Sequence, residues 1–318
     1  MDVLISHTSA FALYDALDDA TLAHRRTILL EALGWDASIP ASHPAVAALS
    51  RPLHILMPFN KRRKLDKCTV HCSSFELPDL STVVLQRHLY AVAPELCFMQ
   101  LARTTDVIDI CQIASRLTAA YRYTPEDTSN LASKTPTTTI ERIRLYRESC
   151  DRTGKQLPAS TSKVCRGLCW AAENAASPRE AALALMLTIP ARCGGFGLPK
   201  PMLNQTIRIP PHIARWAGKQ SYRCDLFWPD ALLAVEYDSD LHASSYQIAK
   251  DAKRRDVLSK LGITTLTVTR VQMNNIEEIR QIAVHIGDLL GTTKHYRSNE
   301  LKERQRMLHA RLLHSQWL

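Results

Sequence analysis

The segment from Arg223 to Arg270 limits the fold of this chain more than any other part of its sequence. It begins with RCDLFWPDALLAVEYDSDLHA and ends with KDAKRRDVLSKLGITTLTVTR. In the first part, acidic and apolar residues alternate on both sides of Pro229-Asp230, a pattern that predicts a β-hairpin. The second part is typical of a basic helix followed by one more strand. This order of elements favours an α/β fold built on a mixed sheet.

The predicted hairpin brings carboxylates together. If Asp230-Ala231 forms a two-residue loop, Asp225 lies directly opposite Glu236, with Cβ atoms about 4.5–5.5 Å apart. Asp238 lies two residues beyond Glu236 and therefore points to the same face. The opposite face carries the apolar side chains that a buried sheet surface needs: Leu226, Trp228, Leu233, Val235 and Tyr237.

Like charges that face each other destabilise a sheet, so this cluster calls for a cation or for protonation. Mg²⁺ (or Mn²⁺) bound by carboxylate oxygens would meet that need. Two other interpretations remain open. Each carboxylate pairs with an arginine or a lysine, or the hairpin has a different register.

The segment resembles the PD-(D/E)XK nuclease superfamily, in particular the branch similar to very-short-patch-repair (Vsr-like) endonucleases. The upstream stretches SPREAALALMLTI and GGFGLPKPMLNQTI resemble the opening helix of that branch and its connection to the first strand. The resemblance implies a restriction-endonuclease-like mixed sheet, flanked by helices, over residues 176–292. The residues that match the hairpin, helix and last strand are Asp225, Trp228-Pro229, Glu236, Asp238, His242, Asp251, Arg254, Leu258, Leu261-Gly262 and Thr269.

The same resemblance implies a catalytic site that hydrolyses phosphodiester bonds in DNA. Asp225, Glu236 and Asp238 would bind the metal, and His242 would act near the scissile phosphate. Glu180 takes the place of a helix carboxylate that often joins such sites. An alternative for Glu180 is structural, because Ser177-Pro178-Arg179-Glu180 also fits a capping box at the start of a helix.

Three positions depart from the family pattern. Asp238 stands where the superfamily motif has lysine, although the Vsr-like branch commonly has aspartate there. Ser239 replaces the glycine that usually follows, and Thr267 stands where an arginine is often found. A degenerate nuclease that keeps only its DNA-binding surface is therefore the alternative.

Positive charge favours a polyanionic partner. The formal net charge is +9, and the charge is concentrated in a few runs. A solvated helix face is the structural alternative for any one of these residues. The residues predicted to bind DNA are Lys250, Lys253, Arg254 and Arg255 in the helix, and Lys61, Arg62 and Arg63 in the run KRRKLDK.

The N-terminal region, residues 1–125, loosely resembles AbiEi-type antitoxins. The matching residues are Pro52, His54, Met57-Pro58, Val70-His71, Leu77-Pro78 and the stretch APELCFMQLA. RPLHILMPF and KCTVHCSS predict two strands of a hairpin with the basic run as its loop. Residues 93–123 predict helices with a break near Thr104-Thr105. The region is therefore expected to be α+β, and a winged helix in its first 50 residues would fit the resemblance.

The remaining segments complete the expected domain order. Residues 126–175 predict a linker followed by two bridging helices, at 138–150 and 160–175. Residues 276–290 predict an amphipathic helix that closes the nuclease-like domain, and residues 293–318 a basic C-terminal helix.

Composition sets the cellular context. No apolar run approaches the roughly 18–20 residues of a membrane span, and the N-terminus lacks the basic start and cleavage site of a signal peptide. A cytoplasmic protein without a small-molecule cofactor is expected. Nine cysteines, an odd number, then indicate free thiols rather than a disulfide framework. Cys68, His71 and Cys72 come nearest to a zinc site but lack a second pair of ligands.

Two principal functions follow. The first is a metal-dependent DNA endonuclease, and the second is a non-catalytic DNA-binding regulator of antitoxin type on a degenerate nuclease fold. Both predict DNA binding that weakens with salt. A third possibility is an interaction module whose partner is a toxin-like protein, which would show as a large exposed apolar patch.

Overall fold

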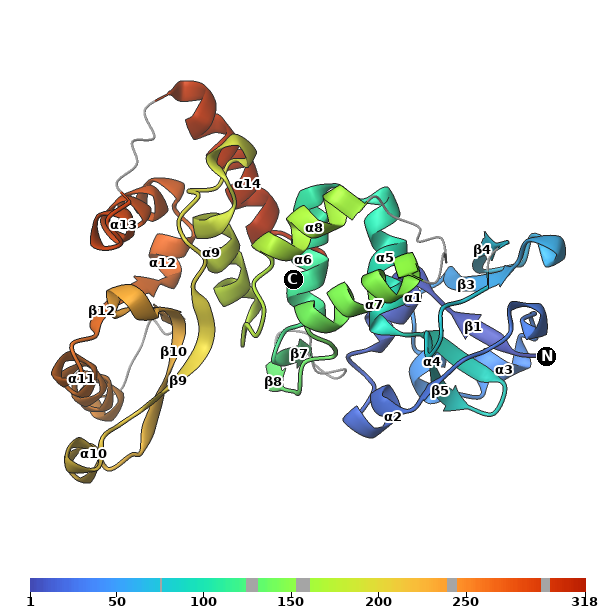
Figure 1. Ribbon diagram of the computed structural model, residues 1–318, viewed down its shortest axis with the longest axis horizontal. Helices are drawn as coiled ribbons and strands as arrows, with labels where there is room; N and C mark the ends of the chain where they lie inside the picture. Colours follow the sequence, from blue (N-terminus) through green and yellow to red (C-terminus); the bar gives the residue numbers. More distant parts are fainter. Residues whose placement is uncertain (75, 124–130, 153–160, 239–244, 293–297) are drawn as a thin grey trace. The chain divides into compact units, whose positions relative to one another are not determined.

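The computed structural model describes the chain except for residues 75, 124–130, 153–160, 239–244 and 293–297, and except for the side chains of 161 and 245–251. The chain divides into two compact units, Met1–Cys169 and Trp170–Leu318 (Figure 1). Both units combine helices with sheets, so the α/β class is confirmed. Where the chain is described, no helix combines the length and the apolar character needed to cross a bilayer.

A six-stranded mixed sheet forms the centre of the N-terminal unit. The strand order is β2-β5-β6-β1-β3-β4, and β1 pairs in parallel with β6 but antiparallel with β3. β1 is fully buried, which fits its run of three apolar residues. The strands are β1 (Val3–Ile5), β2 (Arg25–Arg26), β3 (Leu53–Pro58), β4 (Cys68–Ser73), β5 (Thr82–Gln86) and β6 (Leu89–Val92).

Helices pack on this sheet and extend the unit. The predicted break is confirmed, because one helix ends at Thr104 and Asp106 caps the next by accepting from the N–H groups of Ile108 and Asp109. The two bridging helices are also present. The helices are α1 (His7–Leu13), α2 (Asp19–Ala23), α3 (Ser38–Ala41), α4 (Pro44–Ala47), α5 (Pro94–Thr104), α6 (Val107–Leu117), α7 (Ile140–Arg152) and α8 (Thr161–Trp170), with 3-10 turns η1 (Leu30–Ala32) and η2 (Phe59–Lys61) and a small hairpin of β7 (Tyr121–Tyr123) and β8 (Leu131–Ser133).

Two expectations for the N-terminal unit are wrong. β3 and β4 are strands as predicted, but they pair in parallel, with Leu53 beside Cys68 and Pro58 beside Ser73. They therefore do not form a hairpin, and the basic run crosses from one end of the pair to the other. The first 50 residues also do not form a winged helix. They supply two strands to the large sheet, and their α-helices have between four and seven residues, too short for a recognition helix.

The C-terminal unit contains a four-stranded mixed sheet in the order β12-β11-β10-β9. The first three strands along the chain are antiparallel, and β12 joins β11 in parallel. This is the predicted order of strand, turn, strand, helix and strand. The strands are β9 (Met202–Arg208), β10 (Ser221–Trp228), β11 (Leu233–Asp238) and β12 (Thr264–Thr269).

The register of the predicted hairpin is confirmed. Leu226 pairs with Val235 and Trp228 pairs with Leu233, the register that sets Asp225 against Glu236. The turn is longer than the predicted two residues. Pro229–Ala231 form the 3-10 turn η4, and Leu232 follows with a left-handed φ of +45°.

Helices cover the sheet of the C-terminal unit, which lies between α11 and α9 in Figure 1. Val257 and Leu258 of α11 are fully buried in one cluster with Phe227 and Ala234 of the sheet. The predicted C-terminal helix packs within the same unit, where its His309 ring bonds to the carbonyl of Met273 at 2.8 Å. The helices are α9 (Pro178–Thr188), α10 (Pro211–Ala217), α11 (Ser245–Lys260), α12 (Arg270–Met273), α13 (Ile276–Leu289) and α14 (Asn299–Leu313), with the 3-10 turn η3 (Ala191–Cys193).

Candidate active site

The predicted carboxylates of the C-terminal unit line one cavity of about 350 Å³. The cavity lies where β10, β11, β12 and α11 meet the start of α9. Acidic and cationic groups therefore share a small space, which is typical of a site that binds a charged ligand. The cavity is lined by Glu180, Asp225, Glu236, Tyr237, Asp238, Arg254, Arg255, Leu258, Thr265 and Thr267.

Asp225 is held by the backbone of the neighbouring strand. Its Oδ2 atom accepts a hydrogen bond of 2.8 Å from the N–H of Tyr237. Burial raises the pKa of Asp225 to about 6, and the negative charge of Glu180 adds to the effect. The Tyr237 N–H and the charges of Arg254 and Arg223 offset part of this rise. A nearby cation would therefore stabilise the ionised form of Asp225.

The two carboxylate oxygens of Glu236 differ in their hydrogen bonding. Its Oε2 atom accepts a hydrogen bond of 2.7 Å from the guanidinium of Arg254, whereas its buried Oε1 atom has no hydrogen-bond partner among the described residues. Burial raises the pKa of Glu236 to about 7, followed by the charge of Asp225. The Arg254 guanidinium and a hydrogen bond from Cys224 offset part of this rise. Arg254 also donates to the carbonyl of Arg223.

Cys224 adjoins this pair, which the sequence did not indicate. The thiol is fully buried and interacts with Glu236 and Arg254. Burial, followed by the charge of Glu236, raises the pKa of Cys224 to about 12. The thiol is therefore neutral and adds no charge to the site. All nine cysteines are thiols rather than members of disulfides, as expected.

Glu180 combines the two roles considered from the sequence. Ser177 caps α9 by accepting from the Glu180 N–H, and the Glu180 carboxylate accepts in return from the N–H of Ala176 at 2.9 Å. This differs from a standard capping box, in which the N-cap residue itself donates. Asn204 of β9 donates to the same carboxylate at 2.8 Å. Glu180 is thus fixed by structural bonds while it lines the cavity and acts on Asp225.

The arrangement can be compared with what a metal requires. Over the described residues, no group of three or more His, Cys, Asp or Glu side chains could hold an ion. Asp238 lines the cavity but does not complete such a group, and His242 lies outside the described residues. Mg²⁺ is commonly bound by only one or two carboxylates, with water and phosphate oxygens as its other ligands. Asp225 and Glu236, with the orphan Oε1 atom, fit that requirement.

The other predicted basic residues lie in different places. Arg255 lines the cavity, whereas the Lys253 ammonium stands 5.7 Å from the centre of the Trp216 ring. The side chain of Lys250 lies outside the described part of the chain. In the N-terminal unit, the Lys61 ammonium donates to the carbonyls of Glu31 and Leu33, Arg63 donates to that of Trp35, and Arg62 lines a second cavity.

Two threonines of β12 also belong to the cavity. Thr267 was noted in the sequence only as a departure from the family pattern, and Thr265 was not noted at all. The register explains their position, because β12 runs parallel to β11 with Thr267 beside Glu236. The Thr265 Oγ1 atom is buried and has no hydrogen-bond partner in the described part of the structure. Both threonines could have been identified from the sequence. Residues two apart in a strand share a face, so Thr265 and Thr267 lie together once β12 is paired with β11.

Replacing Asp225 with asparagine should stabilise the C-terminal unit at neutral and higher pH. Asparagine still accepts from the Tyr237 N–H, but it removes a half-buried charge next to Glu180 and Glu236. Unfolded Asp225 loses its proton near 3.8, whereas the folded chain keeps that proton up to about 6. The free energy of unfolding that Asp225 contributes therefore falls as the pH rises through this window.

We expect Asp225→Asn to raise the free energy of unfolding by about 2 kcal/mol at about pH 8, and by much less at about pH 4.5. Urea unfolding of both proteins at the two pH values, in EDTA, measures the difference. An equal gain at both pH values would contradict the raised pKa.

Comparison with known proteins adds no assignment: no protein-family model, no curated protein and no solved structure matches the chain.

Proposed function

We propose that the chain is a metal-dependent DNA endonuclease whose active site is the cavity of the C-terminal unit. One observation carries the proposal. Two half-buried carboxylates with raised pKa values, Asp225 and Glu236, share this cavity with the guanidinium groups of Arg254 and Arg255. The order α9, β9, β10, β11, α11, β12, with the short helix α10 between β9 and β10, supports it, because the motifs of restriction-endonuclease-like domains follow the same order.

The residues of the cavity divide the work of phosphodiester hydrolysis. Asp225 and Glu236 would hold Mg²⁺, which when bound neutralises charge at phosphorus and lowers the pKa of a water ligand. The Tyr237 N–H fixes the orientation of Asp225. Arg254 and Arg255 would bind the phosphate oxygens, for which the planar guanidinium group is well suited.

An adjoining surface on α10 and α11 offers a path for DNA. Trp216 is 45% exposed, and the ammonium groups of Lys253 and Lys260 lie 5.7 and 4.0 Å from the centre of its ring. Tyr222 of β10 is buried in the core, and the Arg254 guanidinium lies 5.8 Å from the centre of its ring. Cations interleaved with aromatic rings bind phosphates and stack on bases. Because Arg254 also lines the cavity, this surface continues into the proposed active site.

The function is tested by incubating the purified chain at low salt with supercoiled, linear and mismatched DNA. Each substrate is incubated with Mg²⁺, with Mn²⁺ and with EDTA. Nicking or cutting that needs the metal supports the proposal. Binding of every substrate without cleavage in any of them would contradict it.

A non-catalytic regulator is the second candidate, and one observation favours it. The Arg254 guanidinium pairs with Glu236 at 2.7 Å and so supplies the positive charge that a metal would bring. A site closed in this way would keep its DNA-binding surface without cleaving. Replacing Arg254 with Gln distinguishes the two candidates. Under both candidates, Arg254→Gln would weaken DNA binding. Only the endonuclease also predicts that the variant changes the metal dependence of DNA cleavage.

Lys260→Gln should weaken DNA binding at the α10–α11 surface. The ammonium group of Lys260 lies over Trp216, so its loss removes one phosphate contact beside the ring. We expect the slope of log K against log salt to decrease by about 0.7–0.9 in magnitude, in accordance with one lost phosphate contact. Fluorescence anisotropy over a salt series measures the slope. Lys302→Gln in α14 is the control and should leave the slope unchanged.

A further inference from the structure

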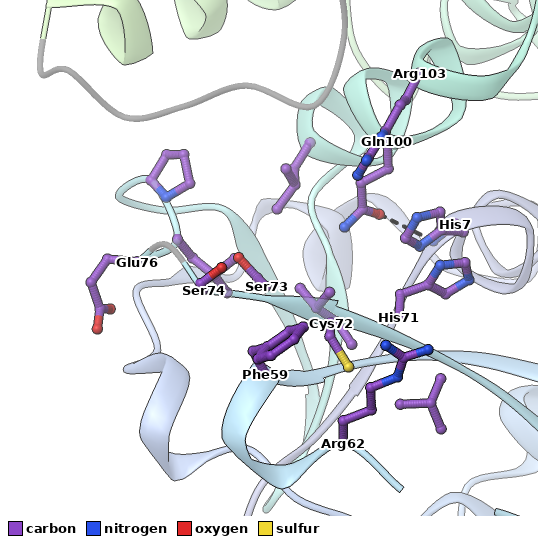
Figure 2. A pocket seen from close by; sticks show the side chains of 15 residues that line it. His7, Phe59, Arg62, His71, Cys72, Ser73, Ser74, Glu76, Gln100 and Arg103 are labelled. Atoms are coloured by element: carbon purple, nitrogen blue, oxygen red, sulfur yellow. Dashed lines mark hydrogen bonds between the residues drawn. The ribbon is translucent and has the colours of Figure 1, made fainter. Parts of the chain in front are cut away.

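A second cavity, of about 630 Å³, lies in the N-terminal unit (Figure 2). Strands β3 and β4, the start of α1, helix α5 and the segment after β4 all contribute to its wall. This volume falls within the range of about 300–1,000 Å³ that small-molecule sites occupy. The cavity is independent of the proposed nuclease site, because all of its lining residues belong to the other unit.

Histidines form one end of this cavity. The rings of His7 and His71 are stacked with their centres 3.4 Å apart, and the Nε2 atom of His71 lies 3.0 Å from the Nδ1 atom of His54. Figure 2 shows the His7 and His71 rings side by side. The Nδ1 atom of His7 meets the Ser6 hydroxyl at 3.0 Å. These bonds use one nitrogen of His7 and one of His71, and among the described residues the second nitrogen of each ring has no further hydrogen bond, so it can serve a ligand.

The histidine wall is neutral and strained. Burial, followed by the proximity of His71, lowers the pKa of His7 to about 3, and burial followed by His54 lowers that of His71 to about 4. His7 also has a φ of +50°, in the left-handed region that residues other than glycine rarely adopt. Its backbone N–H is fixed by the Gln100 side chain at 3.1 Å. Strain of this kind persists where the surrounding structure enforces it, and it is concentrated at binding sites.

Two arginines give the cavity its charge. Arg62 follows η2 and Arg103 lies on α5, and both line the space next to the histidines. The Arg62 guanidinium points toward His71 in Figure 2, and the charge of Arg103 acts on His7. Neither guanidinium has a hydrogen-bond or ion-pair partner among the described side chains. Glu76 is the one carboxylate in the described lining, and its side chain points away from the histidines (Figure 2).

Apolar side chains also line the cavity. Phe59 is 60% exposed and lies near the centre of Figure 2, so one face of its ring is open to a ligand. Leu56, Val70 and Leu77 also line the cavity, and Leu56 lies beside His71 in the pairing of β3 with β4. A ligand that matches this lining has an anionic head for the two guanidinium groups and a planar body that stacks on the Phe59 ring.

We propose that this cavity binds a nucleoside phosphate, either free or as the 5′-phosphorylated end of a nucleic acid strand. The phosphate contacts Arg62 and Arg103, the base stacks on Phe59, and the neutral imidazoles of His7 and His71 exchange hydrogen bonds with the sugar or the phosphate. The two sources share the same recognised group, so the probes must separate them.

Cys72 supplies a local reporter, because it is half-buried in the lining of this cavity, whereas Cys169 is exposed elsewhere. The full chain in EDTA is treated with iodoacetamide, and the alkylation of each cysteine is followed by peptide mass spectrometry. The probes are AMP, adenosine, inorganic phosphate, and a thymidine dinucleotide with either a 5′-phosphate or a 5′-hydroxyl. Calorimetry gives the affinities.

We expect AMP to slow the alkylation of Cys72 but not of Cys169, and to bind about tenfold or more tightly than adenosine. Arg62→Gln and Arg103→Gln should each weaken AMP binding by about tenfold, and Arg63→Gln, the neighbouring control, should not. Phe59→Ala should weaken AMP but not inorganic phosphate. Tighter binding of the 5′-phosphorylated dinucleotide than of AMP would assign the strand end as the source, and the reverse would assign the free nucleotide.

Three outcomes would overturn the proposal. They are equal binding of adenosine and AMP, equal loss of AMP binding in Arg62→Gln and Arg63→Gln, and no probe that protects Cys72. Thermal unfolding of each variant separates lost binding from lost folding, since Arg62 and Arg103 are exposed and their removal leaves the core intact. An effect of these variants on DNA cleavage is not required, because the nuclease proposal rests on the other unit.

Discussion

Glu236→Gln and Asp225→Asn should each reduce the rate of metal-dependent DNA cleavage by about 10³-fold or more. A bound metal stabilises the transition state by several kcal/mol, and each 1.36 kcal/mol changes the rate about tenfold. Both variants keep the size of the side chain and remove the negative charge that would hold the metal. The reason for the large effect is the small number of ligands. Only these two half-buried carboxylates have raised pKa values in the described part of the cavity.

The matched control is Asp230→Asn, in the exposed turn of the same hairpin. It changes the net charge by the same amount, and we expect it to leave the rate unchanged within about twofold. Rates of supercoiled-plasmid nicking over a Mg²⁺ series supply the measurement. DNA affinity in EDTA should be unchanged or slightly tighter in all three variants, because each removes a negative charge. Cleavage that persists in both cavity variants would place the chemistry elsewhere.

The expected gain in stability of Asp225→Asn gives this result its meaning. A variant that unfolds would also be inactive, but a variant that is more stable and inactive has lost a functional group. The same ionised Asp225 would then lower the stability of the folded chain and be required for its activity. Functional sites commonly carry such a cost.

Gly195→Ala should cause the largest loss of stability, about 3 kcal/mol or more, because overpacking a site closed by backbone leaves little room for relaxation. A Cβ atom on Gly195 would lie 1.9 Å from the carbonyl oxygen of Ile189 and 2.6 Å from its carbon. The surrounding segment cannot move away easily. Phe196 donates to the Met186 carbonyl at 3.0 Å and Gly197 to the Ile189 carbonyl at 2.9 Å, so both neighbours are bonded back to the end of α9.

Gly287→Ala in α13 is the control for this substitution. Its Cβ atom would meet Leu198 at 3.5 Å, which is an ordinary contact, and alanine favours a helix by up to about 1 kcal/mol over glycine. We therefore expect no loss, or a small gain, in the midpoint of urea unfolding of the C-terminal unit. If Gly195→Ala were as stable as Gly287→Ala, the close approach between Gly195 and Ile189 would not exist in solution.

The C-terminal hairpin could be predicted from the sequence because its determinants are local. Alternation fixes which side chains share a face, and a turn near Pro229 fixes the register, so the position of Asp225 against Glu236 followed from spacing alone. Even the wrong turn length did no harm. Two residues or four in the turn leave the same residues opposite each other, because Trp228 faces Leu233 in both.

The N-terminal unit shows what local patterns leave undetermined. The apolar runs around Ile55 and Val70 identified two strands, but nothing in either run encodes the direction of its partner. The short connection favoured a hairpin, whereas the structure has a parallel pair. The contact between His54 and His71 depends on that pairing, and His7 joins them from a distant part of the chain. Long-range packing of this kind has no periodic signal.

The position of β1 in the sheet has a consequence for biosynthesis. Val3 pairs with Leu89 and Ile5 with Ile55, so this three-residue strand links the part of the sheet formed by β6 and β5 to the part formed by β3 and β4. During translation β1 is made well before either partner and has to wait, unpaired, for both. Such long sequence separations slow folding. A nascent chain that stops short of β6 therefore exposes an apolar strand that a chaperone would bind.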